Sequence, residues 1–468
     1  MNFPLDGRVV IIDDKFHEAL PLIRVLSQKR VATTFFSGRV EELPSKPFED
    51  VRMVFLDIVL EGLESADDKT KVSTLVNVIK RIISKKNGPF ILAIWTKHPE
   101  MAEKIQKVLK NEGYYIIVAN LEKDKFFRRK EKDDRDEYFE YIFEESKLNE
   151  LKKKLKEQLG PVDIFKVLIN WENLIHDAAS KTINEVSRFT KYDDNWNNEM
   201  KKIFYNLAKA WAGRTIEDKE NTDKIRSALY SFHQLFSDVF ERELQRIEIE
   251  DIPLKEEDIG DDEVRGKINF RILMDSNNEE KIYPGNVYKG GNNIKQLIYD
   301  SIDRDSLISD FARSKKMNKQ DILDENNKIK EEYNNDFKKF FKEIREKLKG
   351  ISIPVVVEVS PICDYAQRKL KKNRYVEGFL CPSIIEVNEI PIKINEKLKR
   401  NALFLYVTPI IQYEENQYVL ILDFRYFGSA NDDFFKDKSF LFRIRKELLS
   451  DIQIKLSHHI NRTGVLFL

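Results

Sequence analysis

Apolar runs alternate with amphipathic stretches over the first 125 residues of the chain. Three of the runs, VRMVFL, FILAIW and YYIIVA, are almost continuously apolar. Strands that are buried on both faces of a parallel sheet have this pattern, whereas strands with one wet face alternate. The stretches between the runs, such as HEALPLIRVLSQK and KVSTLVNVIKRIISKK, carry apolar residues at three- and four-residue spacing, which predicts helices. We therefore expect residues 1–127 to form a doubly wound parallel α/β sheet.

The pattern changes three times after this region. Residues 128–160 are dense in Lys, Arg, Glu and Asp around an apolar cluster, YFEYIF, and we expect a charged linking helix, either solvated or bound to a partner. Amphipathic segments such as KIRSALYSFHQLFSDVFERELQRI predict a helical domain over residues 161–254. Short apolar segments separated by Pro and Gly predict a β-rich, barrel- or sandwich-like α+β domain over residues 263–468. Within it we expect strands at INFRILMD and KIYPGNVYK, and a long inserted helix around NKQDILDENNKIKEEYNNDFKKFFKEIREKLKG.

The bulk composition limits the classes of function. Lys plus Arg and Asp plus Glu each number 80, so the chain lacks the basic excess typical of nonspecific nucleic-acid binding. The two cysteines, Cys363 and Cys381, are too few for a disulfide framework. The beginning, MNFPLDGRVV, lacks the profile of a secretory signal, and no stretch is long and apolar enough to span a membrane. We expect a cytoplasmic protein without a nucleic-acid or membrane partner.

Polar side chains follow three of the apolar runs at the point where each predicted strand ends. Asp13 and Asp14 follow the first run, Asp57 follows VRMVFL, and Thr96 follows FILAIW. Because the carboxyl ends of parallel strands meet at one edge of a sheet, these side chains are expected to converge there. Carboxylate oxygens suit Mg²⁺, and a carboxylate can accept a phosphoryl group as an acyl phosphate. The pattern predicts a magnesium site at Asp13, Asp14 and Asp57, with Asp57 as the attacking group.

The segments IIDD, VFLDIVL and AIWTKH resemble the response-regulator receiver family of two-component signalling, over roughly residues 7–127. The resemblance implies a flavodoxin-like fold, phosphotransfer from a histidine kinase to Asp57, and a hydrogen bond from Thr96 to the phosphoryl group. It also implies a lysine after the fifth strand, for which Lys123 is our choice, with Lys97 and Lys125 as alternatives. The chain departs from the family pattern there, because YYIIVANLEKDKF has no Lys-Pro pair. The usual proline-containing loop after the phosphoacceptor is missing as well.

Two weaker patterns lie further along the chain. Arg226 and His233, in RSALYSFH, resemble the Arg-to-His motif of HEPN-type RNases, in which His serves as general base and Arg stabilises phosphate charge. The alternative is a surface Arg and a half-buried His on one amphipathic helix, and such pairs arise often by chance. The segment SPICDYAQRK looks like a motif of uncharacterised C-terminal β domains in bacterial defence and mobile-element proteins, and it assigns no activity.

The chain also contains residue types that bind zinc. The possible zinc ligands are Cys363 and Cys381, together with His458 and His459. No closely spaced cysteine pair nucleates such a site, and apolar neighbours favour buried, inert thiols.

These patterns favour a regulatory protein that accepts a phosphoryl group, because no complete catalytic set appears after residue 127. The architecture is similar to the phosphate-buffering receiver proteins of Detocs-type anti-phage two-component systems. That resemblance implies a phosphoprotein in a bacterial phosphorelay with an antiviral defence role, partnered by a histidine kinase and by a companion response regulator or effector. Self-association into a homo-oligomer is compatible with it. The alternatives are a receiver-switched RNase and a receiver that serves as an unphosphorylated scaffold.

Overall fold

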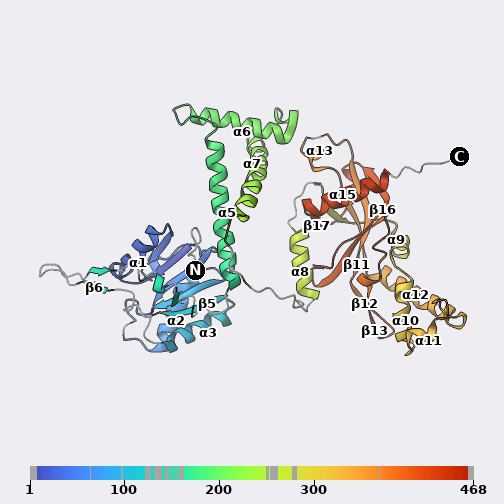
Figure 1. Ribbon diagram of the computed structural model, residues 1–468, viewed down its shortest axis with the longest axis horizontal. Helices are drawn as coiled ribbons and strands as arrows, with labels where there is room; N and C mark the ends of the chain where they lie inside the picture. Colours follow the sequence, from blue (N-terminus) through green and yellow to red (C-terminus); the bar gives the residue numbers. More distant parts are fainter. Residues whose placement is uncertain are drawn as a thin grey trace. The chain divides into compact units, whose positions relative to one another are not determined.

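The computed structural model divides into two compact units (Figure 1). The first consists of Met1–Ile203 and Tyr230–Pro253, and the second of Phe204–Leu229 and Leu254–Leu468. The structure describes residues 8–63, 65–95, 99–121, 128–130, 140–142, 147, 149–151, 153–154, 157, 163–248, 252, 262–276, 282–367 and 369–461.

The first unit contains a five-stranded parallel sheet with the strand order β2-β1-β3-β4-β5. This order is that of flavodoxin-like folds, so the predicted doubly wound sheet is confirmed. The strands are β1 (Arg8–Ile12), β2 (Thr33–Phe36), β3 (Val51–Asp57), β4 (Phe90–Trp95) and β5 (Ile116–Leu121). The connecting helices are α1 (Phe16–Gln28), α2 (Asp68–Ile82) and α3 (Pro99–Asn111), whereas a short 3-10 helix, η1 (Val40–Glu42), stands between β2 and β3.

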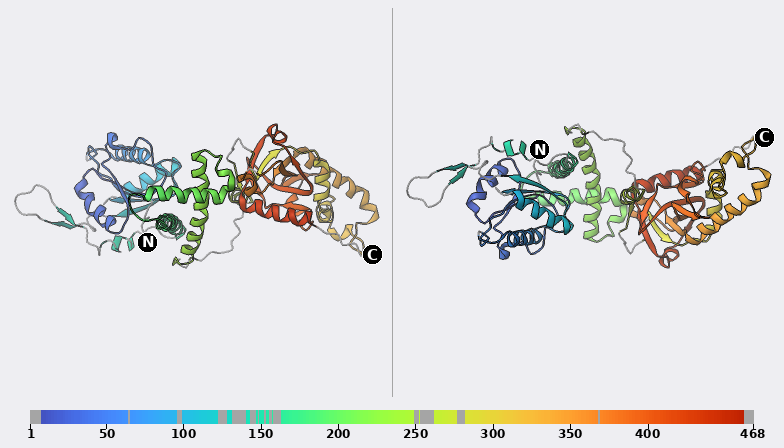
Figure 2. Two further views of the ribbon diagram at one scale, coloured as in Figure 1. Left: turned by 90° about the horizontal axis from the view of Figure 1, so that it is seen from above. Right: turned by 90° about the horizontal axis from the view of Figure 1, so that it is seen from below.

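Alternate residues of each strand bury themselves in two separate cores, one on each face of the sheet. Along β3, Val54 and Leu56 pack with α2 and α3, whereas Met53 and Phe55 pack with α1 and the beginning of α5 (Asp163–Ser187). The helical layers on the two faces can be followed in Figures 1 and 2. Because both faces are covered, the strands need apolar residues at nearly every position, which explains the continuous apolar runs.

Two described parts of the charged segment after the sheet are extended, in contrast to the linking helix expected over residues 128–160. A two-stranded antiparallel ladder joins β6 (Arg128–Lys130) to β7 (Glu140–Ile142), and β7 lies against α1. The physical reason is composition, because aromatic and β-branched residues such as those around β7 favour extended backbone over helix. Helical residues are found further on, between 147 and 157.

The predicted central helices are present. They are α5, α6 (Trp196–Ala212) and α7 (Asn221–Leu244), with the 3-10 helix η3 (Gly213–Ile216) between the last two. Within the first unit, ion pairs link α5 to the end of α7, at 2.6 Å between Lys181 Nζ and Glu243 Oε2 and at 3.1 Å between Arg242 and Glu185.

The second unit is built on one open antiparallel sheet of eight strands. Its hydrogen-bonded path runs β14-β16-β11-β10-β9-β17-β8, with β15 also paired to β16, and over the described residues no ladder joins the two ends. The predicted β-rich domain is therefore confirmed. Its strands form one curled sheet, and not the closed barrel or the two stacked sheets that were expected. The strands are β8 (Met274–Asp275), β9 (Asn286–Lys289), β10 (Ile353–Glu358), β11 (Asn373–Pro382), β14 (Leu405–Val407), β15 (Ile411–Tyr413), β16 (Asn416–Ala430) and β17 (Phe440–Ile444), and a separate hairpin pairs β12 (Ile384–Val387) with β13 (Ile390–Lys393).

Helices cover both faces of this sheet, which removes the need for a second sheet. Ile421 of β16 packs with the inserted helices on one face, and its neighbours Leu420 and Leu422 pack with α15 on the other. The segment INFRILMD is mostly helical, in contrast to the expected strand, because its residues complete α8 and only the last two extend into β8. The helices are α8 (Asp262–Leu273), α9 (Ile294–Ser301), α10 (Ile308–Ser314), α11 (Lys319–Ile322), α12 (Glu331–Ile351), α13 (Ile362–Ala366), α14 (Asp433–Lys436) and α15 (Lys446–Ile460), with short 3-10 helices η4 (Asp305–Leu307) and η5 (Ile394–Glu396). None of the helices in the described part of the chain has the length and apolar composition needed to cross a bilayer.

The centre of the first sheet should dominate the stability of the first unit. Phe55 is fully buried in the core shared with α1 and α5. Phe55→Ala should lower the free energy of unfolding by about 3–5 kcal/mol, because it removes a large apolar surface and leaves a cavity. Tyr115→Ala is the matched control, since that ring is 71% exposed, and it should cost less than about 1 kcal/mol. Equal losses for the two variants in denaturant-induced unfolding would contradict this assignment of the core.

Candidate functional site

Two of the predicted carboxylates lie at the same edge of the first sheet. Strands β1 and β3 pair in parallel with Ile12 opposite Leu56, so Asp13 and Asp57 stand at the carboxyl ends of neighbouring strands. Asp13 is 2% exposed, and its backbone N–H donates to the carbonyl oxygen of Phe36 at 3.1 Å. Asp57 is half-buried. The sheet thus brings together side chains that are far apart in the sequence.

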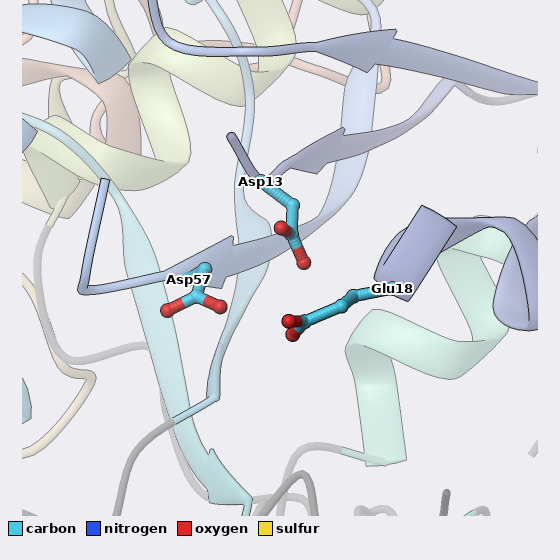
Figure 3. Close-up of side chains that lie close together, drawn as sticks. All are labelled: Asp13, Glu18 and Asp57. Carbon is cyan, nitrogen blue, oxygen red and sulfur yellow. The ribbon is translucent and has the colours of Figure 1, made fainter. Parts of the chain in front are cut away.

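A third carboxylate, Glu18, completes the group. It belongs to the first turn of α1, and its oxygen lies within 4.8 Å of carboxylate oxygens of Asp13 and Asp57. Figure 3 shows the three side chains turned toward one another. Sequence reasoning missed Glu18, because a glutamate in the first turn is ordinarily explained by the positive end of the helix dipole. The signal that was available is its position five residues after Asp13, at the start of the helix that follows β1.

Backbone donors orient two of these carboxylates. The N–H of Lys15 donates to Oδ1 of Asp13 at 2.9 Å, and the N–H of Val59 donates to Oδ1 of Asp57 at 3.0 Å. Each bond closes a tight turn just after its strand. The acidic side chains are therefore held by the loops that leave β1 and β3.

Asp14, the other member of the predicted acidic pair, is half-buried beside this group. Burial raises the pKa of Asp14, the charge of Lys15 opposes that rise, and the neighbouring charge of Asp57 adds to it. Asp14 is thus electrostatically part of the site. The three carboxylates that converge within ligand distance are Asp13, Glu18 and Asp57, so Glu18 holds a place that was predicted for Asp14.

The donor set fits a hard divalent cation. Carboxylate oxygens are the ligands that Mg²⁺, Ca²⁺ and Mn²⁺ favour, and several such charges at close range repel one another unless a cation lies between them. Part of the counter-charge comes from Lys15, whose Nζ lies 3.7 Å from Oε1 of Glu18. That ammonium is 54% exposed, so water screens it and it neutralises the group only in part.

Four predicted site residues lie outside the residues that the structure describes. They are Thr96, Lys97, Lys123 and Lys125. Their roles as hydrogen-bond donor and charge partner of a phosphoryl group stay predictions.

The residues of the alternative RNase reading lie on α7. The guanidinium of Arg226 pairs with Asp223, one turn earlier, at 3.1 Å, and its side chain is 74% exposed. His233 is exposed, and its ring stacks on Phe236 at 6.3 Å between centroids. These contacts are those of an ordinary solvated helix, and they favour the reading of Arg226 and His233 as surface residues.

The two cysteines have different surroundings. Cys363 is exposed on α13, whereas Cys381 is buried in β11, where burial raises the pKa of its thiol to about 12. A buried thiol with such a pKa stays protonated when no metal is bound, as is typical of an inert structural cysteine. Over the described residues, the group of metal-ligating side chains that converges contains neither cysteine and neither His458 nor His459.

No known family model matches the chain, and no curated protein resembles it at a significant level.

Glu18 should contribute to cation affinity. Glu18→Gln removes one of three converging negative charges, and we expect Mn²⁺ to bind at least about tenfold more weakly, which corresponds to about 1.4 kcal/mol. Free Mn²⁺ measured by electron paramagnetic resonance gives the affinity directly. Protonation of the carboxylates should also weaken binding as the pH falls.

Two matched variants test the specificity of this effect. Glu103→Gln removes an exposed carboxylate from α3 and should leave Mn²⁺ affinity unchanged. Lys15→Met removes the ammonium beside Glu18 and should tighten binding. Equal affinities of the wild type and Glu18→Gln would show that Glu18 is not a ligand.

Proposed function

We propose that the first unit is a response-regulator receiver domain that accepts a phosphoryl group on Asp57. The observation that supports this proposal best is the convergence of Asp13, Glu18 and Asp57 at the carboxyl edge of a sheet with the order β2-β1-β3-β4-β5. Ligands of open α/β sheets bind at this edge. The resemblance of IIDD, VFLDIVL and AIWTKH to the receiver family points to the same site.

The proposed reaction moves a phosphoryl group from a phosphohistidine to a carboxylate. An oxygen of Asp57 attacks the phosphorus, the bond between phosphorus and the imidazole nitrogen breaks, and the imidazole leaves with the electron pair of that bond. The product is an aspartyl phosphate, an acyl phosphate. Transfer of this kind depends on positioning and charge compensation more than on acid-base groups.

The residues of the site have separate parts in this proposal. Asp13, Glu18 and Asp57 would hold Mg²⁺, which offsets the negative charge of the phosphoryl oxygens when it is bound. The N–H of Val59 holds Asp57 in place through one of its carboxylate oxygens. The loop after β1 fixes Asp13 through Lys15. Thr96 and Lys123 keep the parts predicted from the receiver pattern.

The proposed biological role is that of a regulator or phosphate buffer in a bacterial two-component system of the anti-phage type. A histidine kinase would supply the phosphoryl group, and a companion response regulator or effector would compete for it. This role rests on the order of the domains, in which a phosphoacceptor unit precedes helices and a β-rich unit of different texture. A second catalytic function is not proposed, because Arg226 is engaged by Asp223 on the surface of α7.

Phosphorylation of Asp57 can be tested with a small donor. Wild-type protein incubated with acetyl phosphate and Mg²⁺ should gain the mass of one phosphoryl group, whereas Asp57→Asn should gain none, because an amide is not a competent nucleophile. Intact-protein mass spectrometry is the measurement. Removal of Mg²⁺ with a chelator should abolish the gain.

Asp68→Asn is the matched control, since this aspartate is 58% exposed on α2 and pairs with Lys104. It should be labelled like the wild type. If the wild type gains no mass with acetyl phosphate or with any histidine kinase from the same genome, the protein is an unphosphorylated scaffold and the proposal fails.

A further inference from the structure

Glu358 is a buried carboxylic acid at the end of β10 in the second unit. The proposed phosphoacceptor, Asp57, belongs to the first unit. Its side chain is 1% exposed. Oε2 accepts a hydrogen bond from the N–H of Ser360 at 3.1 Å, whereas Oε1 is buried and has no hydrogen-bond partner among the residues that the structure describes. A buried ionised carboxylate with one bare oxygen is costly, so this geometry favours the neutral acid.

The groups around Glu358 come from every element that packs on it. From β9, Tyr288 lies close enough for its hydroxyl to interact with the carboxylate charge, and it accepts a hydrogen bond from Asn286 Nδ2 at 2.9 Å. From β11, the charge of Arg374 favours ionisation of Glu358, and Tyr375 stands opposite Glu358 in the ladder.

The remaining neighbours are two uncharged polar groups and one closed ion pair. Tyr365 of α13 interacts with Tyr288, and α15 contributes the amide of Gln453. The charged pair of Arg443 and Asp275, on β17 and β8, is closed by a 2.8 Å hydrogen bond. Burial raises the pKa of Glu358, and the hydrogen-bond donors around the carboxyl group lower it. Burial is the larger effect and raises the pKa to about 7.

Glu358 also anchors the segment that follows it, residues 359–367, which contains the SPICDYAQ motif. The hydroxyl of Ser360 bonds to Glu358 and accepts from the N–H of Arg374 at 2.9 Å. The amide of Gln453 donates to the carbonyl oxygens of Val359 at 3.1 Å and of Ser360 at 2.9 Å. The segment is therefore tied to the sheet through a short chain of hydrogen bonds that starts at the buried carboxyl.

The far end of the segment reaches the turn between α6 and α7 of the same unit. A Cβ atom placed on Gly213 would lie 3.5 Å from Cδ of Gln367. Gly213 has a φ of +64°, so a larger residue there would be strained. Movement of residues 359–367 would consequently change the packing of Gln367 against this turn.

We propose that the protonation state of Glu358 controls the position of residues 359–367. The neutral acid holds this segment on the end of the sheet, and ionisation of the carboxyl group releases it. In the open state the carboxylate is hydrated and titrates at its ordinary value of 4.5. The closed state binds the proton more tightly, so its advantage is complete below about pH 4.5 and is lost as the pH rises through about 7.

Hydrogen exchange of residues 359–367 measures the opening. After correction for the intrinsic rate, the opening equilibrium should rise roughly thirtyfold between about pH 5.5 and about pH 8.5. Glu358→Gln keeps the shape and neutrality of the acid, so it should hold the segment closed at both values. Glu386→Gln removes an exposed carboxylate from β12 of the same unit and should behave as the wild type.

A second variant keeps Glu358 and moves its titration. Ser360→Ala removes a donor that stabilises the ionised form, so the midpoint of the pH-dependent exchange should shift upward. An infrared band of a protonated carboxyl group should follow the same midpoint in the wild type. The proposal is overturned if exchange of the segment is independent of pH in the wild type, if Glu358→Gln retains the dependence, or if Ser360→Ala leaves the midpoint in place.

Discussion

The parallel pairing of β1 with β3 is the constraint on which the candidate site depends. The two strands are buried on both faces, and a slip of one residue would exchange the side chains that face the two helical layers. The register with Ile12 opposite Leu56 is therefore set by the apolar residues along the strands. Asp13 and Asp57 are placed side by side as a consequence, although like charges repel. The free energy gained by packing the sheet offsets the repulsion between the carboxylates at its edge.

The two units solve the problem of a carboxyl group at a strand end in different ways. In the first unit, Asp13 and Asp57 accept bonds from backbone N–H groups of the following loops and share their edge with Glu18. Such a cluster favours the binding of a cation. In the second unit, Glu358 is a single buried carboxyl group with aromatic and amide neighbours and the charge of Arg374. One of its oxygens has no hydrogen-bond partner among the described residues, so burial favours the protonated form. The difference follows from the number of negative charges that converge and from the burial of each.

Much of the first unit could be predicted because one physical rule covers it. Continuous apolar runs indicated strands with two buried faces, and the residues just past them indicated the ligand edge. Glu18 was missed, because its approach to Asp57 depends on the direction in which α1 leaves β1. The same limit applies to α8, whose sequence suits a strand and which is helical where it packs on the sheet. The open form of the second sheet also depends on tertiary packing, since helices on both faces are not visible in the strand pattern.

The first turn of α1 is the compliant part of the candidate site. Strand β3 lies between two cores whose residues are almost fully buried, and close packing resists displacement of such a strand. Helix α1 contains Pro21, which has no N–H to donate to the carbonyl oxygen of His17, so its first turn is bonded more weakly to the rest of the helix. That turn carries Glu18, and Lys15 precedes it. A change of charge at Asp57 would therefore be taken up first by the turn that bears Glu18, while the register of β1 and β3 stays as it is.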